Sequence, residues 1–589
     1  SAGLLVIRPN SFGSGTYQVA TNATLETEVI TPNSTLSVSS LTIAGGSTNT
    51  ISLLTPGNPS TAAINAATLT VNGPATIRLT GSQFAAGTFP LISYGGGSVG
   101  GTGGFSALQL ALPAGVNGQL IDTGSSIELQ ITGVYQNLTW QGTVNNVWDV
   151  NGTSNWLNQA TSLISDYQEN NGVGDNVTFD DSGGAVPSIA LDATVQPSAV
   201  IANNDASVTY TISGSGKISG KTGLQILGGG TLVLATANDY SGVTTLSGGV
   251  LQIGNGGTTG SLGTNNVNVL YNGTDLAFNR TDAITVNNAI VNAGGTPNID
   301  INSGTVTLGG SADNLGTLAN VNAGGTLVLA KNSSPTVDAV DNLHINTGGL
   351  VQLGGTGGNQ ILDSVYVQML GGTFDLAGQA ETINGIRGGY GVITDSGVSG
   401  MLNLGNTAGI TAQTGVLTIA GGTINAQHIN SIYDATYLQT GGTVSCNLFY
   451  DGQTSGSTYA AADFEGGTFT DSGTFVLGQN CPGELTVGGS AVVSANVINI
   501  GHQSGLVYLN GGTLNMGYFN NSGTVASSVY FNGTLVGGTI STTILRSSTT
   551  SFYDSTNGAI FDSQGNALTL DQPLVTDPAE TRAIAAAAR

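Results

Sequence analysis

The sequence is poor in charged residues, above all in basic ones. Of its 589 residues only 7% are charged, against about a quarter in an ordinary soluble domain. Lys and Arg together number ten, and the formal net charge is −24 at pH 7. Nucleic acids and anionic lipid surfaces repel a polyanion, so we expect neither as a partner. The sequence also lacks a run of about eighteen apolar residues, which predicts that no segment spans a membrane.

Recognisable catalytic motifs are also missing. Residues 213–223 (SGSGKISGKTG) come close to a phosphate-binding loop, but Ser215 stands where the motif requires its first glycine, so nucleotide binding is not expected. His344, His428 and His502 lie far apart without metal-ligand spacing, and we expect each in a loop. We therefore predict no catalytic residue, no metal and no cofactor. A β-helix polysaccharide lyase or hydrolase remains the enzymatic alternative, although the clustered carboxylates that it needs are not evident.

Glycine, by contrast, is abundant, with 92 residues, and it separates short apolar runs. The runs GGTLVLA at residues 229–235 and GGVLQIG at 248–254 begin nineteen residues apart. Similar runs follow as far as GGTIST at residues 537–542, and neighbouring copies are mostly nineteen to twenty-six residues apart. Each run is typical of a short strand entered through a tight turn. Because one such strand cannot bury its apolar face alone, the period predicts coils stacked into a β-solenoid.

These runs carry a family resemblance. Residues 229–263 resemble the autotransporter-associated β-strand repeat of surface and secreted proteins of Gram-negative bacteria, and residues 475–517 resemble a related repeat in which an IG strand alternates with a GGT strand. The resemblance covers most of residues 183–545. It implies an all-β fold, a right-handed parallel β-helix, and an extracellular or bacterial cell-surface location. It does not imply one activity, because such coils serve adhesins, fibres and stalks.

Four segments follow from these patterns. Residues 1–135 alternate apolar and polar positions, which predicts a β domain, and their last part resembles the sandwich-like cap that ends a repeat module. Residues 136–182 are a tryptophan-containing linker and residues 183–576 the solenoid. Residues 577–589 combine an early proline with an alanine run, which predicts a short helix. Neither a signal peptide nor a translocation domain is recognisable, so we expect passenger material.

The linker holds Trp140, Trp148 and Trp156, the only tryptophans of the chain. Flat aromatic faces suit sugar rings, so one interpretation is a glycan-stacking platform. The other, which we favour, is a small β-domain whose core is filled by its largest side chains.

An acidic group lies in the same linker and raises the question of calcium, which hard carboxylate oxygens bind. Its members lack the ordered spacing of a calcium loop, so a solvated acidic loop is the favoured interpretation. The group consists of Asp166, Glu169, Asp175, Asp180 and Asp181.

Only two cysteines are present, Cys446 and Cys481. Stacked strands lie about 4.8 Å apart and disulfide-linked Cα atoms about 5.5–6 Å apart, so a disulfide between nearby coils is geometrically allowed. The alternative is two small residues that fill turns of the stack. The sequence leaves both interpretations open.

The N-terminal strand Leu4, Leu5, Val6 and Ile7 is apolar, with only Arg8 beside it as a charge. An uncapped strand of this kind pairs with another chain or within its own domain. Pairing with the next subunit predicts a head-to-tail homopolymer. We therefore expect a non-enzymatic extracellular structural protein that assembles into a surface fibre, layer or stalk. The alternative is an adhesin passenger that binds glycans or surfaces.

Overall fold

The structure, a computed structural model, confirms the predicted fold class: the chain is a β-solenoid and nearly all of its regular structure is strand. The helix expected at residues 577–589 lies outside the described residues. No helix in the described part of the chain is long and apolar enough to cross a membrane. The described residues are 3–9, 14–55, 57–81, 84, 87–113, 116–170, 173–332, 337–355, 359–453, 459–521, 527–531, 534–536, 550–554, 560–562 and 574–576.

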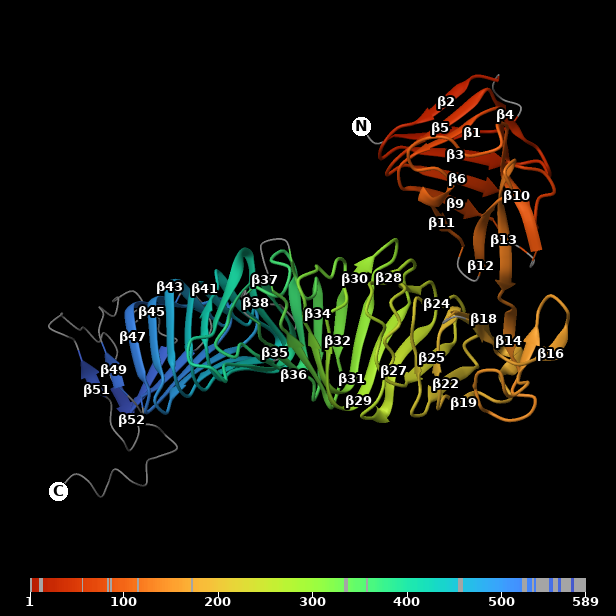
Figure 1. Ribbon diagram of the computed structural model, residues 1–589. Helices are drawn as coiled ribbons and strands as arrows, with labels where there is room; N and C mark the ends of the chain where they lie inside the picture. The colour runs from red at the N-terminus through yellow and green to blue at the C-terminus, as the bar shows by residue number, and fades with distance from the viewer. Residues whose placement is uncertain are drawn as a thin grey trace. The chain divides into compact units, whose positions relative to one another are not determined.

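The chain divides into two compact units. The first comprises residues 1–186, 192–201 and 218–223, and the second comprises residues 187–191, 202–217 and 224–589. Figure 1 shows both units and the labels used below.

The first unit begins as a small parallel solenoid with three faces. Its complete coils add one strand to each face, and an antiparallel pair closes the third face. The first face contains β1 (Leu4–Ile7), β3 (Thr24–Val29), β6 (Thr48–Leu53), β9 (Ala75–Thr80) and β11 (Leu108–Ala111). The second contains β2 (Thr16–Val19), β5 (Ser40–Ala44) and β8 (Leu69–Asn72). The third contains β4 (Leu36–Val38), β7 (Ile64–Ala66), β10 (Gly87–Tyr94), β13 (Ser126–Val134) and β12 (Val116–Asp122).

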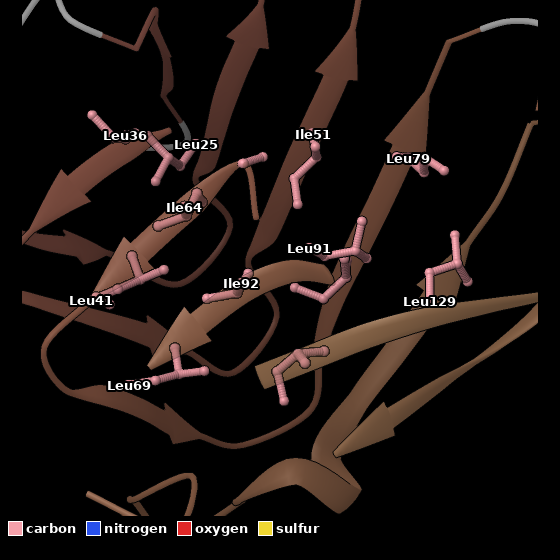
Figure 2. Packing of buried hydrophobic residues seen from close by; sticks show 14 of the residues in the cluster. Leu25, Leu36, Leu41, Ile51, Ile64, Leu69, Leu79, Leu91, Ile92 and Leu129 are labelled. Carbon is pink, nitrogen blue, oxygen red and sulfur yellow. The ribbon is translucent and has the colours of Figure 1, made fainter. Parts of the chain in front are cut away.

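Equivalent apolar residues of successive coils stack in the core of this solenoid. Leu36, Ile64 and Ile92 are in register on β4, β7 and β10, and each is at most 1% exposed. Leu41 and Leu69 form a second such pair on β5 and β8. Figure 2 shows these side chains pointing into the space between the faces. The alternating sequence pattern of these strands therefore places one side of each strand in a continuous core.

The tryptophan segment follows in the same unit. Strands β14, β15 and β16 pair antiparallel, and β14 also pairs parallel with β18, which pairs with β17. The strands are β14 (Asn137–Trp140), β15 (Trp156–Asn158), β16 (Leu163–Ser165), β17 (Glu169–Asn170) and β18 (Val173–Asp180). Two 3-10 turns are also present, η1 (Phe105–Ala107) and η2 (Asp181–Gly183), and further strands are β20 (Thr194–Val195), β21 (Pro197–Asn203) and β23 (Lys217–Ile218).

The second unit is a long stack of parallel strands, which follow one another in chain order (yellow to blue in Figure 1). One narrow face holds β24 (Gly223–Ile226), β26 (Thr244–Leu246), β28 (Val267–Val269) and β30 (Ile290–Asn292). The main sheet begins with β19 (Ser188–Ala190), β22 (Thr209–Ser213), β25 (Thr231–Ala235), β27 (Val250–Gly257), β29 (Asp275–Val286), β31 (Asn298–Leu308), β32 (Leu318–Val321), β33 (Gly325–Leu329), β34 (Asn342–Asn346), β35 (Leu350–Leu353), β36 (Tyr366–Asp375), β37 (Ala380–Thr394) and β38 (Met401–Ile419).

The main sheet continues to the end of the described chain. Its later strands are β39 (Thr423–Asn425), β40 (His428–Gln439), β41 (Thr443–Asp451), β42 (Ala460–Phe464), β43 (Thr468–Leu477), β44 (Gly483–Gly488), β45 (Val492–Ile500), β46 (Gly505–Asn510), β47 (Thr513–Asn521), β48 (Ser527–Phe531), β49 (Thr534–Val536), β50 (Thr550–Asp554), β51 (Ile560–Asp562) and β52 (Leu574–Thr576). Several strands turn a corner, so the start of β38 pairs with β39 and its remainder with β40.

The glycine pairs let these coils pack closely. Gly249 has a φ of 56°, and a Cβ on it would meet the carbonyl oxygen of Gly230, one coil earlier, at 2.1 Å. Only glycine combines a left-handed backbone with this approach. The strands that follow each pair stack their leucines, as Leu232 does on Leu251, and both are fully buried. The repeated runs of the sequence are therefore the buried strands that the period predicts.

Candidate functional site

The three tryptophans are core residues, so the glycan-stacking interpretation is corrected. Trp140, Trp148 and Trp156 are all 0% exposed. Trp156 makes edge-to-face contacts with both others, at ring-centroid distances of 5.0 Å to Trp140 and 5.3 Å to Trp148. Tyr167 and Phe179 complete the cluster. No face of these rings is open to a sugar, because a β-segment with few apolar residues needs its largest side chains inside.

The acidic group beside the tryptophans accepts hydrogen bonds from the protein itself. Asp175 is 2% exposed, and its carboxylate accepts from the backbone N–H groups of Gln136 at 2.6 Å and Gln168 at 3.0 Å. Burial raises the pKa of Asp175 to about 6. Glu169 accepts from the Tyr167 hydroxyl at 2.8 Å. Among the described residues, no group of three or more His, Cys, Asp or Glu side chains is placed to hold a metal ion.

The two cysteines are free thiols, and the disulfide that the sequence left open is not formed. Cys446 lies on β41 in register with Asp471 of β43. Cys481 lies against Gly452, where an added Cβ would meet its Sγ at 2.9 Å. Both thiols are buried, and burial raises the pKa of each, that of Cys481 to about 11. They are therefore small core residues in different parts of the stack.

Strand β1 ends the first face of the first unit. It pairs in parallel with β3. One edge of β1 is therefore paired within its own domain, as the second of the two predictions for this strand has it. Ile7 is buried, whereas Leu4, Leu5 and Val6 are 64%, 51% and 41% exposed. A hollow of about 220 Å³ lies beside them, lined by Gly3, Leu4, Leu5, Tyr17, Gln18, Val19, Ala23, Thr24 and Leu25. An apolar edge strand and an apolar hollow thus occur together at this end of the unit.

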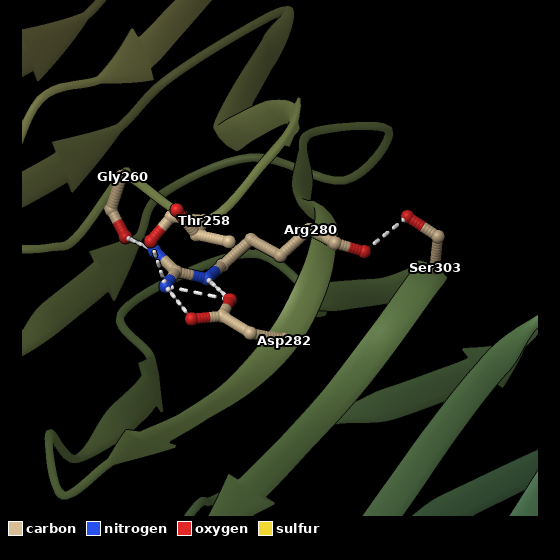
Figure 3. Close-up of polar contacts among 5 residues, drawn as sticks. All are labelled: Thr258, Gly260, Arg280, Asp282 and Ser303. Carbon is tan, nitrogen blue, oxygen red and sulfur yellow. Dashed lines mark hydrogen bonds and ion pairs between the residues drawn. The ribbon is translucent and has the colours of Figure 1, made fainter.

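Arg280 has a structural role. Figure 3 shows its guanidinium inside the loop that follows β27. It is 7% exposed, donates to both carboxylate oxygens of Asp282 at 2.9 Å, and also donates to the carbonyl oxygens of Thr258 and Gly260. Ser303 donates to the Arg280 carbonyl oxygen at 2.7 Å. The guanidinium is therefore occupied by its own chain and is not free for an acidic ligand.

A second buried polar network joins four successive coils. Lys331 is 0% exposed and its Nζ donates to the carbonyl oxygens of Gly309 and Ala312. The Gln360 side chain accepts from the Lys331 backbone N–H at 2.8 Å and donates to the Lys331 carbonyl oxygen at 3.0 Å. Glu381 in turn accepts from the Gln360 backbone N–H at 2.7 Å. Each side chain thus pairs backbone groups of a neighbouring coil that the strand ladder leaves unpaired.

Burial shifts the pKa values of two members of this network, Lys331 and Glu381. It lowers the pKa of Lys331 to about 8 and raises the pKa of Glu381 to about 8. His344, expected in a loop, instead lies on β34 between Asn320 and Gln368 of the neighbouring coils, and burial lowers its pKa.

Outward-facing amides and hydroxyls form columns along the second unit. Asn322 donates to the Asn302 side-chain oxygen and accepts from Asn346, both at 2.8 Å, across three successive coils. Side-chain amides in register at the strand spacing can form such a ladder along the whole stack. The columns therefore present the same polar groups at regular intervals.

One such column borders a hollow of about 340 Å³, here called the polar groove. One wall is the column Asn403, Asn425, Ser445 and Thr470, whose members are in register on β38, β39, β41 and β43. The full lining is Asn403, Leu404, Asn425, Ala426, Gln427, Ser445, Cys446, Asn447, Thr470 and Ser472. Sequence reasoning missed this site. Its only sequence signal is the polar residue two positions after the threonine of successive GGT runs.

The architecture and this surface define a class, a parallel β-solenoid protein with hydrogen-bonding columns on its outside. Residues 227–253 match the family model described as passenger-associated-transport-repeat. A stretch of 147 residues is 35% identical to the Adhesin BmaC autotransporter of Brucella suis biovar 1 (strain 1330). It covers 24% of this chain and 4% of that relative, so the chain spans a small part of the relative's length. No solved structure matches the chain significantly.

The repeat match confirms the resemblance derived from the glycine-separated runs. It lies on the coils formed by β25 and β27, where the two clearest runs of the sequence stack on each other. The chain is thus a β-solenoid in which residues 227–253 match a passenger-associated-transport repeat.

Proposed function

We propose that this chain is an extracellular adhesin passenger, a non-enzymatic scaffold that binds glycans or surfaces outside the cell. The passenger repeat at residues 227–253 and the adhesin relative support the location and the class of function. The observation that carries the proposal is the set of outward amide and hydroxyl columns on successive coils, such as Asn403, Asn425 and Ser445. Repeated at about 4.8 Å, such groups let many weak contacts act together.

Binding fits the chain better than catalysis. Three charged side chains of the solenoid, Arg280, Lys331 and Glu381, are buried and hydrogen-bonded to backbone groups rather than available to a glycan. A polysaccharide lyase or hydrolase needs such groups free at the surface to move protons.

The purified chain, immobilised on beads, tests this proposal. We expect saturable retention on glycan-coated or epithelial surfaces and no release of reducing ends or unsaturated products from polysaccharides. Beads carrying a denatured sample are the control. Retention no greater than that of the control would rule out the adhesion proposal. Steady product release would show that the chain is an enzyme.

A second function, self-association, rests on a different observation. The exposed face of β1 and its neighbouring hollow offer an apolar edge to a strand of another copy, and edge strands are templates for such pairing. We propose a head-to-tail homopolymer in which this edge is one of the two contact surfaces, giving a fibre, layer or stalk.

A single charge on this edge tests self-association. Leu5→Lys places a cation on half-exposed Leu5 at the end of the stack, beside the hollow, and should abolish filaments in electron micrographs while the far-ultraviolet circular dichroism stays unchanged. Val398→Lys is the matched control, because Val398 is fully exposed in the second unit. Filaments that survive Leu5→Lys would place the contact elsewhere.

A further inference from the structure

The polar groove combines an outward polar column with a hollow, and its lining carries no charge. Its lining contains amides, hydroxyls and three small or apolar side chains, and no charged residue, in a chain of net charge −24. The neighbouring carboxylate, Asp471, alternates to the inside of β43 and is 2% exposed. A ligand in the groove therefore meets neither a cation that would bind an anionic sugar nor an exposed carboxylate.

The groove offers both donors and acceptors in a fixed arrangement. Ser445 Oγ donates to Asn425 Oδ1 at 2.9 Å, and Asn425 Nδ2 donates to Asn403 Oδ1 at 2.8 Å. Each amide has two N–H donors and two lone pairs, so groups remain for a ligand after these contacts. Because the side chains hold one another in place, binding costs less side-chain entropy than at a free surface.

The second wall and the floor add a different chemistry. Gln427, Asn447 and Ser472 also line the groove, each two residues after a member of the first wall, and Ser472 donates to Asn447 Oδ1 at 3.2 Å. Leu404, Ala426 and Cys446 lie between the walls and are 5–7% exposed. Polar rims over a small apolar floor suit a molecule with hydroxyls at its edges and C–H groups on its face.

Size limits the ligand further. The volume of about 340 Å³ lies at the lower end of the range for small-molecule sites, about 300–1,000 Å³. The first wall spans four coils, which is about 14 Å at the strand spacing. An elongated ligand along the solenoid axis fits this shape better than a single compact one.

We propose that the polar groove binds a short, uncharged oligosaccharide along the solenoid axis. The proposal rests on the adhesin function above and names its ligand class. Sugar hydroxyls both donate and accept, as the amides and hydroxyls of the groove do, whereas sialylated, sulfated or uronic-acid glycans would bring a charge that no groove residue neutralises.

A glycan array followed by calorimetry tests the proposal with the full chain. We expect neutral oligosaccharides to be retained in preference to sialylated and sulfated ones. Asn425→Ala removes the central amide of the wall and should weaken the best neutral ligand by about tenfold or more, the effect of one to two lost hydrogen bonds. Thr470→Trp, a surface change, should fill the groove and abolish binding.

Asn322→Ala is the matched control. Asn322, like Asn425, donates one side-chain hydrogen bond to the preceding coil and accepts one from the next, but it does not line the groove. It should leave affinity unchanged. Equal losses in Asn425→Ala and Asn322→Ala, or unchanged affinity in Thr470→Trp, would overturn the groove site.

The two proposals fail in different ways. If the wild-type beads adhere and the array retains only anionic glycans, the groove inference is wrong and adhesion stands. If the groove variants lose the array ligand but keep full adhesion, the groove binds sugar without serving adhesion, which overturns the link between them. If the wild type adheres to nothing and the array is blank, both proposals are wrong.

Discussion

Glu381 should make the middle of the solenoid more stable in mild acid than at alkaline pH. Its side chain is 1% exposed and accepts from three backbone N–H groups, those of Gln360 at 2.7 Å, Thr382 at 3.1 Å and Ile361 at 3.4 Å. Burial outweighs these hydrogen bonds and raises the pKa from 4.5 to about 8. At pH 7 the folded chain therefore carries a neutral carboxyl group where the unfolded chain carries a carboxylate.

The sign follows from proton linkage. Between pH 4.5 and about 8 the folded state binds one proton more than the unfolded state at this site, so stability falls as the pH rises through that range. The contribution is fully present below pH 4.5 and is lost above about 8. At about 1.4 kcal/mol per pH unit, the full range corresponds to about 5 kcal/mol. Lys331, with a pKa lowered to about 8, acts only above that range, where it raises stability toward pH 10.5.

Amide hydrogen exchange is the suitable assay, because long repeat arrays do not unfold in one two-state step and a local measurement avoids that difficulty. The peptide covering residues 359–384 should show protection factors, corrected for intrinsic exchange, that fall from pH 5 to pH 8. Peptides from the coils of β25 and β27, which carry no such carboxyl group, serve as the internal reference.

Glu381→Gln tests whether Glu381 causes the pH dependence of the protection factors. The amide cannot ionise, so the variant should lose most of the pH dependence, although it loses stability at pH 5 because an amide nitrogen faces a backbone donor. Protection that stays level or rises from pH 5 to pH 8 in the wild type would refute the reasoning and show that the three N–H groups keep Glu381 ionised.

Three further predictions concern stability. Leu329 stacks between Leu308 and Leu353, so Leu329→Asp buries an unpaired charge and should lower the free energy of unfolding by about 3–5 kcal/mol. Wild-type thermal stability of this variant would contradict the inward placement of Leu329. Arg280→Gln removes the hydrogen bonds that the guanidinium donates to the loop after β27 and should lower the free energy of unfolding by about 2–3 kcal/mol. Proteolysis at residues 254–263 should then be faster. Unchanged cleavage there would show that the loop is stable without Arg280. Asp471, whose pKa burial raises to about 6, should be replaceable by Asn with a gain in melting temperature at pH 8 and none at pH 5; a loss at both would show that its carboxylate is needed.

Much of the fold was readable from the chain because a solenoid is built from local repeats. The runs around Leu232 and Leu251 predict short strands, and their period predicts the stacking, since each strand can bury its apolar face only on the next coil. The small number of basic residues and the absence of catalytic motifs predict neither a nucleic-acid partner nor catalysis, and both stay predictions. For the tryptophans, composition left two interpretations, and only the packed cluster of Trp140, Trp148 and Trp156 decided between them.

The site was beyond sequence reasoning because it depends on register and on where the coils bend. Asn403, Asn425 and Ser445 look like ordinary turn-associated residues along the chain, and they form one wall only because parallel pairing aligns them. Cys446 and Cys481 are within reach of each other by strand spacing, yet the stack places them apart. The sequence by itself determined the repeat, the buried strands and the scarcity of basic residues. The tertiary structure decided which outward side chains share a column and which column borders a groove, because alignment between coils is a property of the stack rather than of any single strand.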